Sequence, residues 1–235
     1  MSRSGLPLAL GAVAALAVAG TVRRRGSSST LPDASLAGPA RMDPMRDRLR
    51  DGDAFDPQHP YTVTSMRDTT VTFDPREGIG EVSDNANITY KGFVVWMPVS
   101  RWLELNPPID PFSDRVKGLE ARLREGAAFA PPFLVVEVLD KDGFPISPYD
   151  IEDSLASVFG GLRVRSHEGR HRMQAIRRFA GDVSVPVQIF TRSDFRARHF
   201  TPAMLRGARI QPDPRVKHAP PFPIGAFVLD GVVYR

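Results

Sequence analysis

The chain of 235 residues contains no cysteine. Disulfide bonds, zinc sites with thiolate ligands and cysteine nucleophiles are therefore excluded from its chemistry. Tryptophan is also rare, with two copies, whereas proline (22) and glycine (19) are frequent enough to indicate many loops. The apolar fraction of 42% is sufficient for a hydrophobic core. Length and composition together predict one domain with extensions, or at most two small domains.

Lysine is absent from residues 163–209, although this stretch is strongly basic. It contains eleven arginines and three acidic residues, within a chain whose net charge is +4. Arginine is suited to planar, bidentate contact with phosphate and carboxylate groups. The pattern predicts an anionic partner, either a nucleotide or a nucleic acid. A basic surface that is simply solvated is the alternative.

Charged residues are missing from residues 4–22, which are rich in Ala, Leu, Val and Gly. As a helix, residues 6–22 would be about 26 Å long, slightly less than the roughly 30 Å hydrocarbon core of a membrane. Three arginines follow at 23–25. We interpret residues 1–25 as an apolar tail or membrane anchor, with the rest of the chain on the cytoplasmic side. A signal peptide cleaved after Ala19, and insertion of residues 5–22 into a virus particle, are the alternatives.

The organisation of the remaining chain follows from composition and periodicity. Residues 26–60 have the composition of a linker, and residues 61–91 form a β-rich lead-in. Residues 92–191 are the main domain, and residues 192–235 are a basic, proline-rich extension that contains a strand pair around Asp230-Gly231. The apolar periodicity of the main domain predicts strands at 93–99, 133–139, 162–166 and 187–190, and helices at 113–125, 148–159 and 170–180. The predicted fold class is α+β, with a small mixed β-sheet and about three packed helices.

The most specific chemistry lies at residues 166–178, which read Ser-His-Glu-Gly-Arg-His-Arg-Met-Gln-Ala-Ile-Arg-Arg. The pattern predicts a strand, a tight turn at Gly169 and the N-terminus of a helix. Unpaired amides and the positive end of the helix dipole bind anions at such a position, phosphate above all. The positive end of the dipole interacts unfavourably with positively charged side chains such as Arg170, His171 and Arg172. A bound anion would make their position favourable. We therefore predict that residues 169–172 bind phosphate.

Two neighbouring side chains are candidates for catalysis at this turn. Glu168 is the nearest carboxylate, and it is a candidate Mg²⁺ ligand or general base. His167 is a candidate proton relay, because the reference pKa of histidine is about 6.5. The expected cofactor is a nucleoside triphosphate (NTP) with Mg²⁺. The structural alternative is that Glu168 pairs with Arg172, since the two residues are four positions apart.

A second basic segment follows the main domain. Arg192, Arg196 and Arg198 alternate with Phe195 and, a little later, Phe200. Basic residues with interleaved aromatic residues are typical of proteins that bind single-stranded nucleic acids. The three arginines are therefore candidate nucleic-acid ligands, although their spacing is loose.

The turn at 166–178 resembles the signature turn of the ParB/sulfiredoxin-like superfamily. ParB-type domains have Gly-Glu-Arg-Arg at this turn, and sulfiredoxins have Gly-Cys-His-Arg. The matching positions are Gly169, His171, Arg172 and Ala175. Residues 119–136 resemble the step from helix to buried strand in this superfamily, and residues 185–189 resemble its closing strand. The resemblance spans residues 92–191. The Glu-Gly-Arg-His-Arg sequence of the turn is most similar to that of uncharacterised phage-encoded relatives.

The departures from the superfamily pattern limit what the resemblance implies. Arg170 stands where sulfiredoxins have their cysteine and ParB proteins their glutamate, so sulfiredoxin chemistry is excluded. The Asn-Pro-x-x-Pro-Arg box of the family is partly matched at residues 106–111, with Phe112 in place of the arginine. In the superfamily the turn holds the phosphates of CTP or ATP, and some relatives are kinases or are called nucleases. The resemblance thus implies a nucleotide-binding pocket.

Two functions from different classes remain open. The first is a nucleotide-binding domain with NTPase or phosphotransferase activity. The second is a non-enzymatic DNA-binding or phage virion-associated protein that has the same fold. A ParB-like nuclease lies between them, but the sequence shows no compact carboxylate cluster with the spacing of a metal site.

Overall fold

The computed structural model describes residues 49–66, 68–78, 92–151, 154–191 and 195–235. The chain divides between Ala37 and Gly38, and all described residues belong to the second part. The predicted anchor and most of the predicted linker therefore lie outside the described residues. In the part of the chain that is described, no helix has the length and apolar character needed to cross a membrane.

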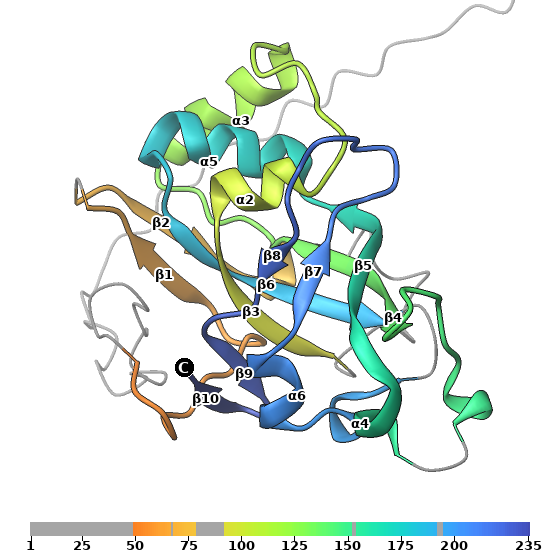
Figure 1. Ribbon diagram of the computed structural model, residues 1–235. Coiled ribbons are helices and arrows are strands. Elements are labelled where there is room, and N and C mark those ends of the chain that lie inside the picture. The colour runs from red at the N-terminus through yellow and green to blue at the C-terminus, as the bar shows by residue number, and fades with distance from the viewer. Residues whose placement is uncertain (1–48, 67, 79–91, 152–153, 192–194) are drawn as a thin grey trace, which may run out of the picture. The chain divides into compact units, whose positions relative to one another are not determined.

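Eight strands form one mixed sheet, in the order β10-β9-β3-β6-β4-β5-β7-β8 (Figure 1). Its strands are β3 (Phe93–Pro98), β4 (Phe133–Asp140), β5 (Phe159–Glu168), β6 (Ser184–Thr191), β7 (Arg209–Gln211), β8 (Phe222–Pro223), β9 (Phe227–Leu229) and β10 (Val232–Tyr234). The β4–β6 and β5–β7 pairs are parallel, and the other pairs are antiparallel. A mixed sheet together with separate helices confirms the α+β class.

The described residues contain five α-helices and three short 3₁₀-helices. The α-helices are α2 (Val99–Glu104), α3 (Asp114–Arg124), α4 (Leu155–Val158), α5 (Arg170–Ala180) and α6 (Pro202–Arg206). The 3₁₀-helices are η1 (Pro75–Gly78), η3 (Pro148–Asp150) and η4 (Ala197–His199). Helices α2, α3 and α5 gather at one end of the sheet, and α4 and α6 lie at the other (Figure 1). Helix α5 contacts both α2 and α3.

The two longest helices form where the sequence predicts them. Helix α5 buries Met173, Ile176 and Ala180 along one stripe, at the spacing of an amphipathic helix. Helix α3 begins after Ser113, whose hydroxyl accepts a hydrogen bond from the Val116 amide. This serine cap satisfies one of the amides that the first turn of a helix leaves unpaired.

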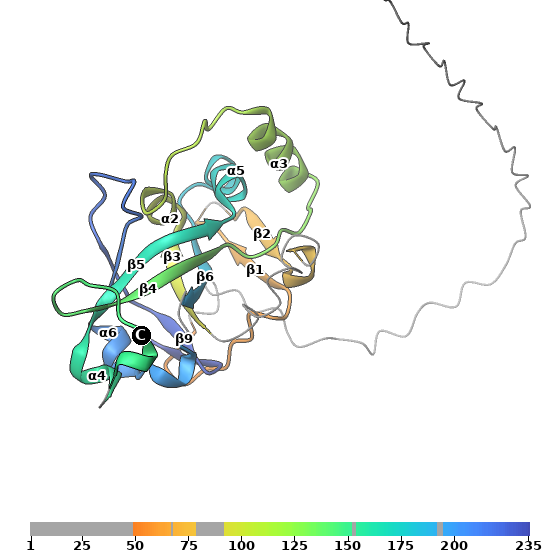
Figure 2. The same cartoon turned by 90° about the vertical axis from the view of Figure 1, so that its right-hand side faces the viewer.

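The predicted helix at 148–159 is wrong. Residues 148–150 form the short η3, α4 has four residues, and β5 already begins at Phe159. Gly160 and Gly161, which precede the predicted strand at 162–166, also lie within β5. A Cβ atom at Gly160 would lie 1.9 Å from the Asp140 carbonyl oxygen, so glycine permits close pairing with β4. Eight residues of β5, from Phe159 onwards, pair with β4 (Figure 2), and this pairing begins directly after α4 ends at Val158.

The C-terminal strands are part of the same sheet as the main domain. Strand β9 pairs with β3, so that Val94 faces Val228, and β10 follows as the outer strand. Asp230 and Gly231 form the turn between β9 and β10, as the sequence indicates, and both have positive φ angles. The sequence pattern places the end of the main domain at residue 191. The sheet nevertheless includes strands that follow this residue in the chain.

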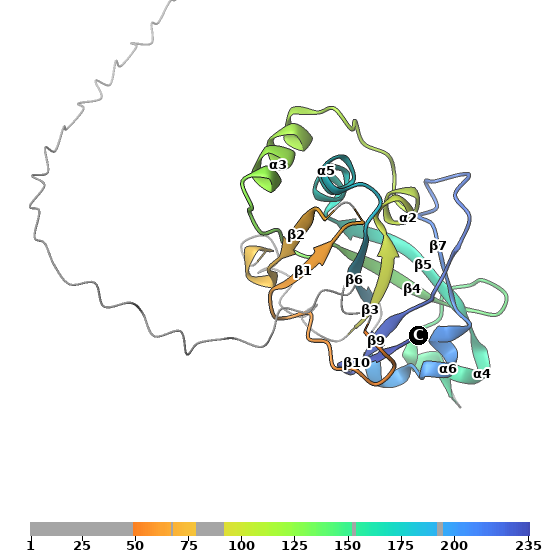
Figure 3. The ribbon, with the colours of Figure 1, turned by 90° about the vertical axis from the view of Figure 1, so that its left-hand side faces the viewer.

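A two-stranded hairpin, β1 (Tyr61–Thr64) and β2 (Thr70–Phe73), packs beside the large sheet (Figure 3). The Tyr61 hydroxyl donates a hydrogen bond to the Pro186 carbonyl oxygen at 3.3 Å. Phe55, just before the hairpin, meets the Trp96 ring edge-on at a centroid distance of 5.1 Å. These contacts join the β-rich lead-in to strands β3 and β6.

Candidate functional site

The strand, tight turn and helix N-terminus predicted around Gly169 are confirmed. Gly169 has φ 112° and ψ 9°, a left-handed conformation that L-residues with a side chain rarely adopt. The first hydrogen bond of helix α5 runs from the Met173 amide to the Gly169 carbonyl oxygen at 2.8 Å. The amides of Arg170 and His171 precede it, so they have no partner within the helix. Amides of this kind, at the N-terminus of a helix, are donors that an anion can accept from.

A pocket of about 230 Å³ opens at this turn. Its charged and titratable lining residues are Glu77, Arg115, Arg122, Glu168, His171 and Arg172. Helix α3 contributes two arginines, α5 contributes Arg172 and His171, and the end of β5 contributes Glu168. Three guanidinium groups face two carboxylates, so a bound anion would be favoured.

Glu168 and Arg172 form the ion pair that the sequence offers as a structural alternative. The Arg172 Nη2 atom lies 3.5 Å from the Glu168 Oε1 atom. The Arg172 side chain is 17% exposed and the Glu168 side chain 43% exposed. The pair is therefore loose and partly solvated on the carboxylate side. A phosphate group could compete with Glu168 for the guanidinium, since both ligands bind arginine in the same bidentate geometry.

The positive charge around the pocket affects the pKa of His171. Burial lowers the pKa of His171, and the positive charges of Arg115 and Arg170 lower it further, against an opposing effect of Glu168. The imidazole is therefore neutral at pH 7. A phosphate bound between these arginines would offset their effect, so it would raise the pKa of His171.

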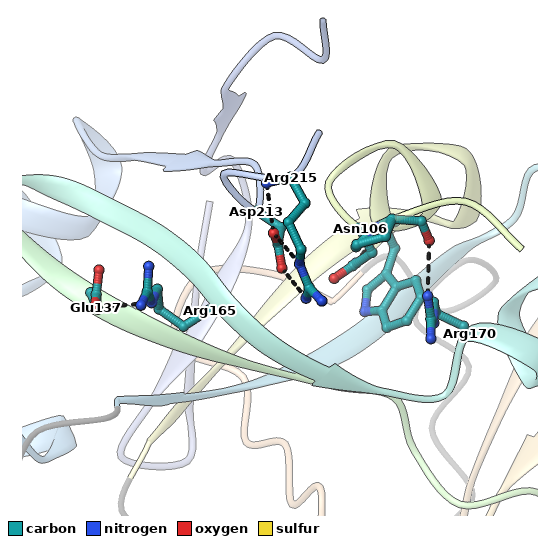
Figure 4. A network of polar contacts seen from close by, with 8 residues as sticks. Asn106, Glu137, Arg165, Arg170, Asp213 and Arg215 are labelled. Atoms are coloured by element: carbon teal, nitrogen blue, oxygen red, sulfur yellow. Dashed lines mark hydrogen bonds and ion pairs between the residues drawn. The ribbon is translucent and has the colours of Figure 1, made fainter. Parts of the chain in front are cut away.

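Arg170 lies on the other side of the turn and does not line the pocket. Its Nη1 atom donates a hydrogen bond to the Pro107 carbonyl oxygen at 3.3 Å (Figure 4). Pro107 belongs to the segment 106–111 that partly matches the proline box of the superfamily. Arg178, two turns along α5, lies over the Phe112 ring at 5.0 Å. The box segment is thus held against helix α5 from both ends.

His167 also lies away from the pocket. Its ring meets the buried Trp102 ring edge-on, at a centroid distance of 5.7 Å. Burial lowers the pKa of His167 to about 4, and the nearby Arg170 adds to the effect. The structure therefore brings Glu168, Gly169, His171 and Arg172 together at one pocket, while His167 and Arg170 lie beyond it.

The candidate nucleic-acid residues are only partly arranged as expected. Arg196 and Arg198 are exposed around η4, whereas Arg192 lies outside the described residues. Phe195 is 3% exposed and Phe200 is 4% exposed. Both rings are part of the core, so they are not available to stack on the bases of a single strand.

No group of three or more His, Asp or Glu side chains within the described residues could hold a metal ion by itself. Magnesium that accompanies a nucleotide is usually bound by one or two carboxylates together with phosphate oxygens and water. Glu168, at the edge of the pocket, is placed for such a role, and Glu77 lies on the same pocket. The residues present fit a metal ion that arrives with its nucleotide.

Sequence reasoning missed the arginines of helix α3. Arg115 and Arg122 are seven residues apart, so they lie on the same face of α3, with Leu119 between them. This spacing predicts that the two arginines share one face of the helix. It does not predict which part of the fold that face contacts. Contact between α3 and α5 decides that.

Comparison with known proteins finds no matching family model, no matching curated protein and no matching solved structure. The resemblance to the ParB/sulfiredoxin-like superfamily therefore rests on the turn motif and on the order of its flanking segments. The function of the chain is inferred from the geometry of the turn pocket.

Proposed function

We propose that this chain is a nucleotide-binding protein of the ParB/sulfiredoxin-like type. The phosphates of an NTP with Mg²⁺ would lie in the pocket at the β5–α5 turn. The observation that carries this proposal is the convergence of Arg115, Arg122 and Arg172 on the N-terminus of helix α5. Guanidinium groups and helix-terminal amides are the two donors that proteins most often direct at phosphate.

The size of the pocket limits what it can enclose. Sites that enclose a drug-sized ligand usually measure about 300–1,000 Å³. A volume of about 230 Å³ suits the phosphate chain, with the base and ribose lying over the surface around it. Selectivity for one base would then depend on residues outside the pocket.

The proposed chemistry is NTP hydrolysis or phosphoryl transfer. Such reactions depend mostly on positioning and on neutralising charge at the transferred phosphoryl group. Arg115, Arg122 and Arg172 would supply the neutralising charge. Glu168 would act as a Mg²⁺ ligand or general base after the phosphate displaces it from Arg172. We assign no proton-relay role to His167, because its imidazole packs against Trp102 and does not line the pocket.

The decisive experiment is isothermal titration of the full chain with ATP, CTP, GTP and UTP in the presence of Mg²⁺. Arg115→Ala removes an exposed guanidinium of the pocket, and Arg172→Ala removes the one at the turn. Each should weaken binding about 10- to 100-fold, since a charged hydrogen bond is worth roughly 1.5–3 kcal/mol. Arg177→Ala is the matched control, because Arg177 is exposed at the C-terminal end of the same helix.

Two results would reject the nucleotide proposal. One is the absence of binding for all four nucleotides by a well-folded protein. The other is binding that Arg115→Ala and Arg172→Ala leave unchanged. Retained binding with Arg177→Ala shows that any loss belongs to the pocket and does not reflect the net charge of the helix.

A non-enzymatic DNA-binding or phage virion-associated role is the second candidate. Arg196 and Arg198 are exposed, whereas Phe195 and Phe200 are buried, so the two arginines would contact phosphates without reading sequence. The expected result is an affinity for DNA that falls steeply with salt, without turnover of any nucleotide. Arg196→Ala with Arg198→Ala would then reduce the salt dependence, whereas Arg115→Ala would not.

A further inference from the structure

Three buried polar atoms on the far side of the turn have no hydrogen-bond partner among the residues that the structure describes. They are the Trp102 Nε1, Asn106 Oδ1 and His167 Nδ1 atoms. The Trp102 residue is 0% exposed and Asn106 is 2% exposed. Buried polar atoms of folded proteins nearly always have a partner, either in the protein or as ordered water. Three such atoms on residues that contact one another therefore indicate a bound molecule.

Contacts among three segments bring these residues together: helix α2 with its C-terminal end, the end of strand β5, and the loop between β7 and β8. The rings of Trp102 and His167 are 5.7 Å apart at an interplanar angle of 88°. Asn106 is one helical turn after Trp102, and its Nδ2 atom donates to the Trp102 carbonyl oxygen at 2.6 Å. The amide of Asp213 donates to the Leu105 carbonyl oxygen at 2.9 Å, which places the β7–β8 loop against the end of α2.

The charges around these atoms limit what can bind. Asn106 lies between Arg170 on one side and the Asp213–Arg215 pair on the other (Figure 4). Asp213 is 2% exposed and accepts hydrogen bonds from the Arg215 guanidinium. An anion would meet the Asn106 oxygen and the Asp213 carboxylate, and a cation would meet Arg170 and the Trp102 N–H group. The ligand is therefore neutral.

The donor and acceptor requirements are specific. The Trp102 N–H group can only donate and the Asn106 Oδ1 atom can only accept. The His167 ring is neutral at pH 7, because its pKa is about 4, so Nδ1 can accept or donate. One oxygen that accepts from Trp102, donates to Asn106 and contacts Nδ1 satisfies all three atoms. A water molecule meets this requirement, and buried waters typically make about three hydrogen bonds.

We propose that Trp102, Asn106 and His167 bind one internal water molecule. The water joins helix α2 to the end of β5, next to the turn that begins helix α5. Through it, the tautomer and orientation of the His167 ring are fixed by α2. The water site does not depend on nucleotide binding, so its test is independent of the test of the proposed function.

The test is nuclear magnetic resonance of the full chain labelled with ¹⁵N. The two indole N–H signals are assigned with Trp102→Phe and Trp96→Phe. We expect a water cross-peak at the Trp102 N–H with the sign of a long-lived bound water. Absence of this cross-peak in the folded protein would overturn the proposal. A scalar coupling across a direct Trp102–His167 hydrogen bond would overturn it too.

Substitution tests the link between the three residues. Trp102→Phe should shift the His167 Nδ1 signal, because the bridging oxygen loses its donor. Trp96→Phe is the matched control, since Trp96, on strand β3, packs against Phe55 and its loss should leave His167 unchanged. Asn106→Leu should remove the water cross-peak and raise the unfolding constant about tenfold. An unchanged cross-peak in Asn106→Leu would exclude Asn106 as a ligand of the water and contradict the proposed site.

Discussion

Gly169 is the residue on which the shape of the turn depends. Its φ of 112° lets β5 change direction into α5 within one residue. A Cβ atom there would also lie 3.4 Å from both the Arg172 Nη2 atom and the Pro132 Cβ atom. Conformation and space therefore both favour glycine, and a side chain would disturb the residues that line the pocket.

The substitution Gly169→Ala should lower the free energy of unfolding by about 1–3 kcal/mol, the usual cost of a strained backbone position. Urea denaturation measures the change. Gly118→Ala is the matched control, because Gly118 lies within helix α3 and a Cβ atom there meets nothing within 4 Å. It should stabilise the protein by about 0.5–1 kcal/mol. Equal effects of the two substitutions would contradict the strain at Gly169.

His167 should make stability depend on pH in a defined window. Its pKa is about 4 in the folded chain, mainly because of burial, and about 6.5 when unfolded. Below pH 6.5 the unfolded state takes up a proton that the folded state does not, so stability falls until about pH 4. We expect His167→Gln to remove this component from a pH series of urea denaturation curves. A folded-state midpoint near 6.5 in an NMR titration of His167 would show that the ring is not buried as described.

At the scale of elements, Glu120 joins helix α3 to helix α5. Its side chain is 8% exposed. It accepts a hydrogen bond from the Arg178 Nε atom at 2.7 Å and forms a second ion pair with Arg124. The hydrogen bond from Arg178 is the main reason why the pKa of Glu120 is lowered. Since α3 carries Arg115 and Arg122, this contact also fixes two arginines of the pocket.

The substitution Glu120→Gln should cost about 1–3 kcal/mol in the free energy of unfolding at pH 7. The lowered pKa means that the carboxylate stabilises the protein fully above the unfolded value, near 4.3. The difference from wild type should therefore shrink as the pH falls below 4.3 through the lowered folded-state pKa. Glu125→Gln, at the exposed C-terminal end of α3, should change stability by less than about 0.5 kcal/mol. A difference that persists unchanged at pH 2 would contradict the role of the charge.

The elements also show how far local pattern predicts structure. Helices α3 and α5 have strong apolar periodicity and clear ends, and the sequence predicts both. Residues 148–159 have a helix start signal and an apolar stripe, yet β5 takes over at Phe159. The local pattern of residues 148–159 is the same in kind as that of α3 and α5, but pairing with β4 begins at Phe159, directly after α4 ends at Val158. Pairing with β4 is a long-range contact that a sequence window does not contain.

At the scale of the whole molecule, the C-terminal strands complete the core. Phe227, Val228, Leu229 and Val233 are each between 0% and 5% exposed. The amide of Val233 donates to the Asp53 carbonyl oxygen, and that of Gly52 to the Val233 carbonyl oxygen. The last ten residues thus join β3 to the first described segment of the chain.

Deletion of residues 226–235 should abolish cooperative unfolding. Each fully buried apolar side chain contributes about 1.5–3 kcal/mol, and the total stability of a domain is about 5–15 kcal/mol. Loss of four such side chains removes most of that stability. Thermal unfolding followed by circular dichroism tests this, with deletion of Arg235 alone as the control. A cooperative transition at the wild-type temperature after the ten-residue deletion would show that β9 and β10 are dispensable.

The sequence by itself determined the α+β class, helices α3 and α5, and the turn at Gly169. These features depend on periodicity, capping residues and glycine conformation, which act within a few residues of one another. Only the tertiary structure decided that Arg115 and Arg122 line the turn pocket and that His167 faces Trp102. It also decided that Phe195 and Phe200 are buried. These facts depend on which distant segments pack together, and packing is settled by the burial of apolar surface over the whole molecule.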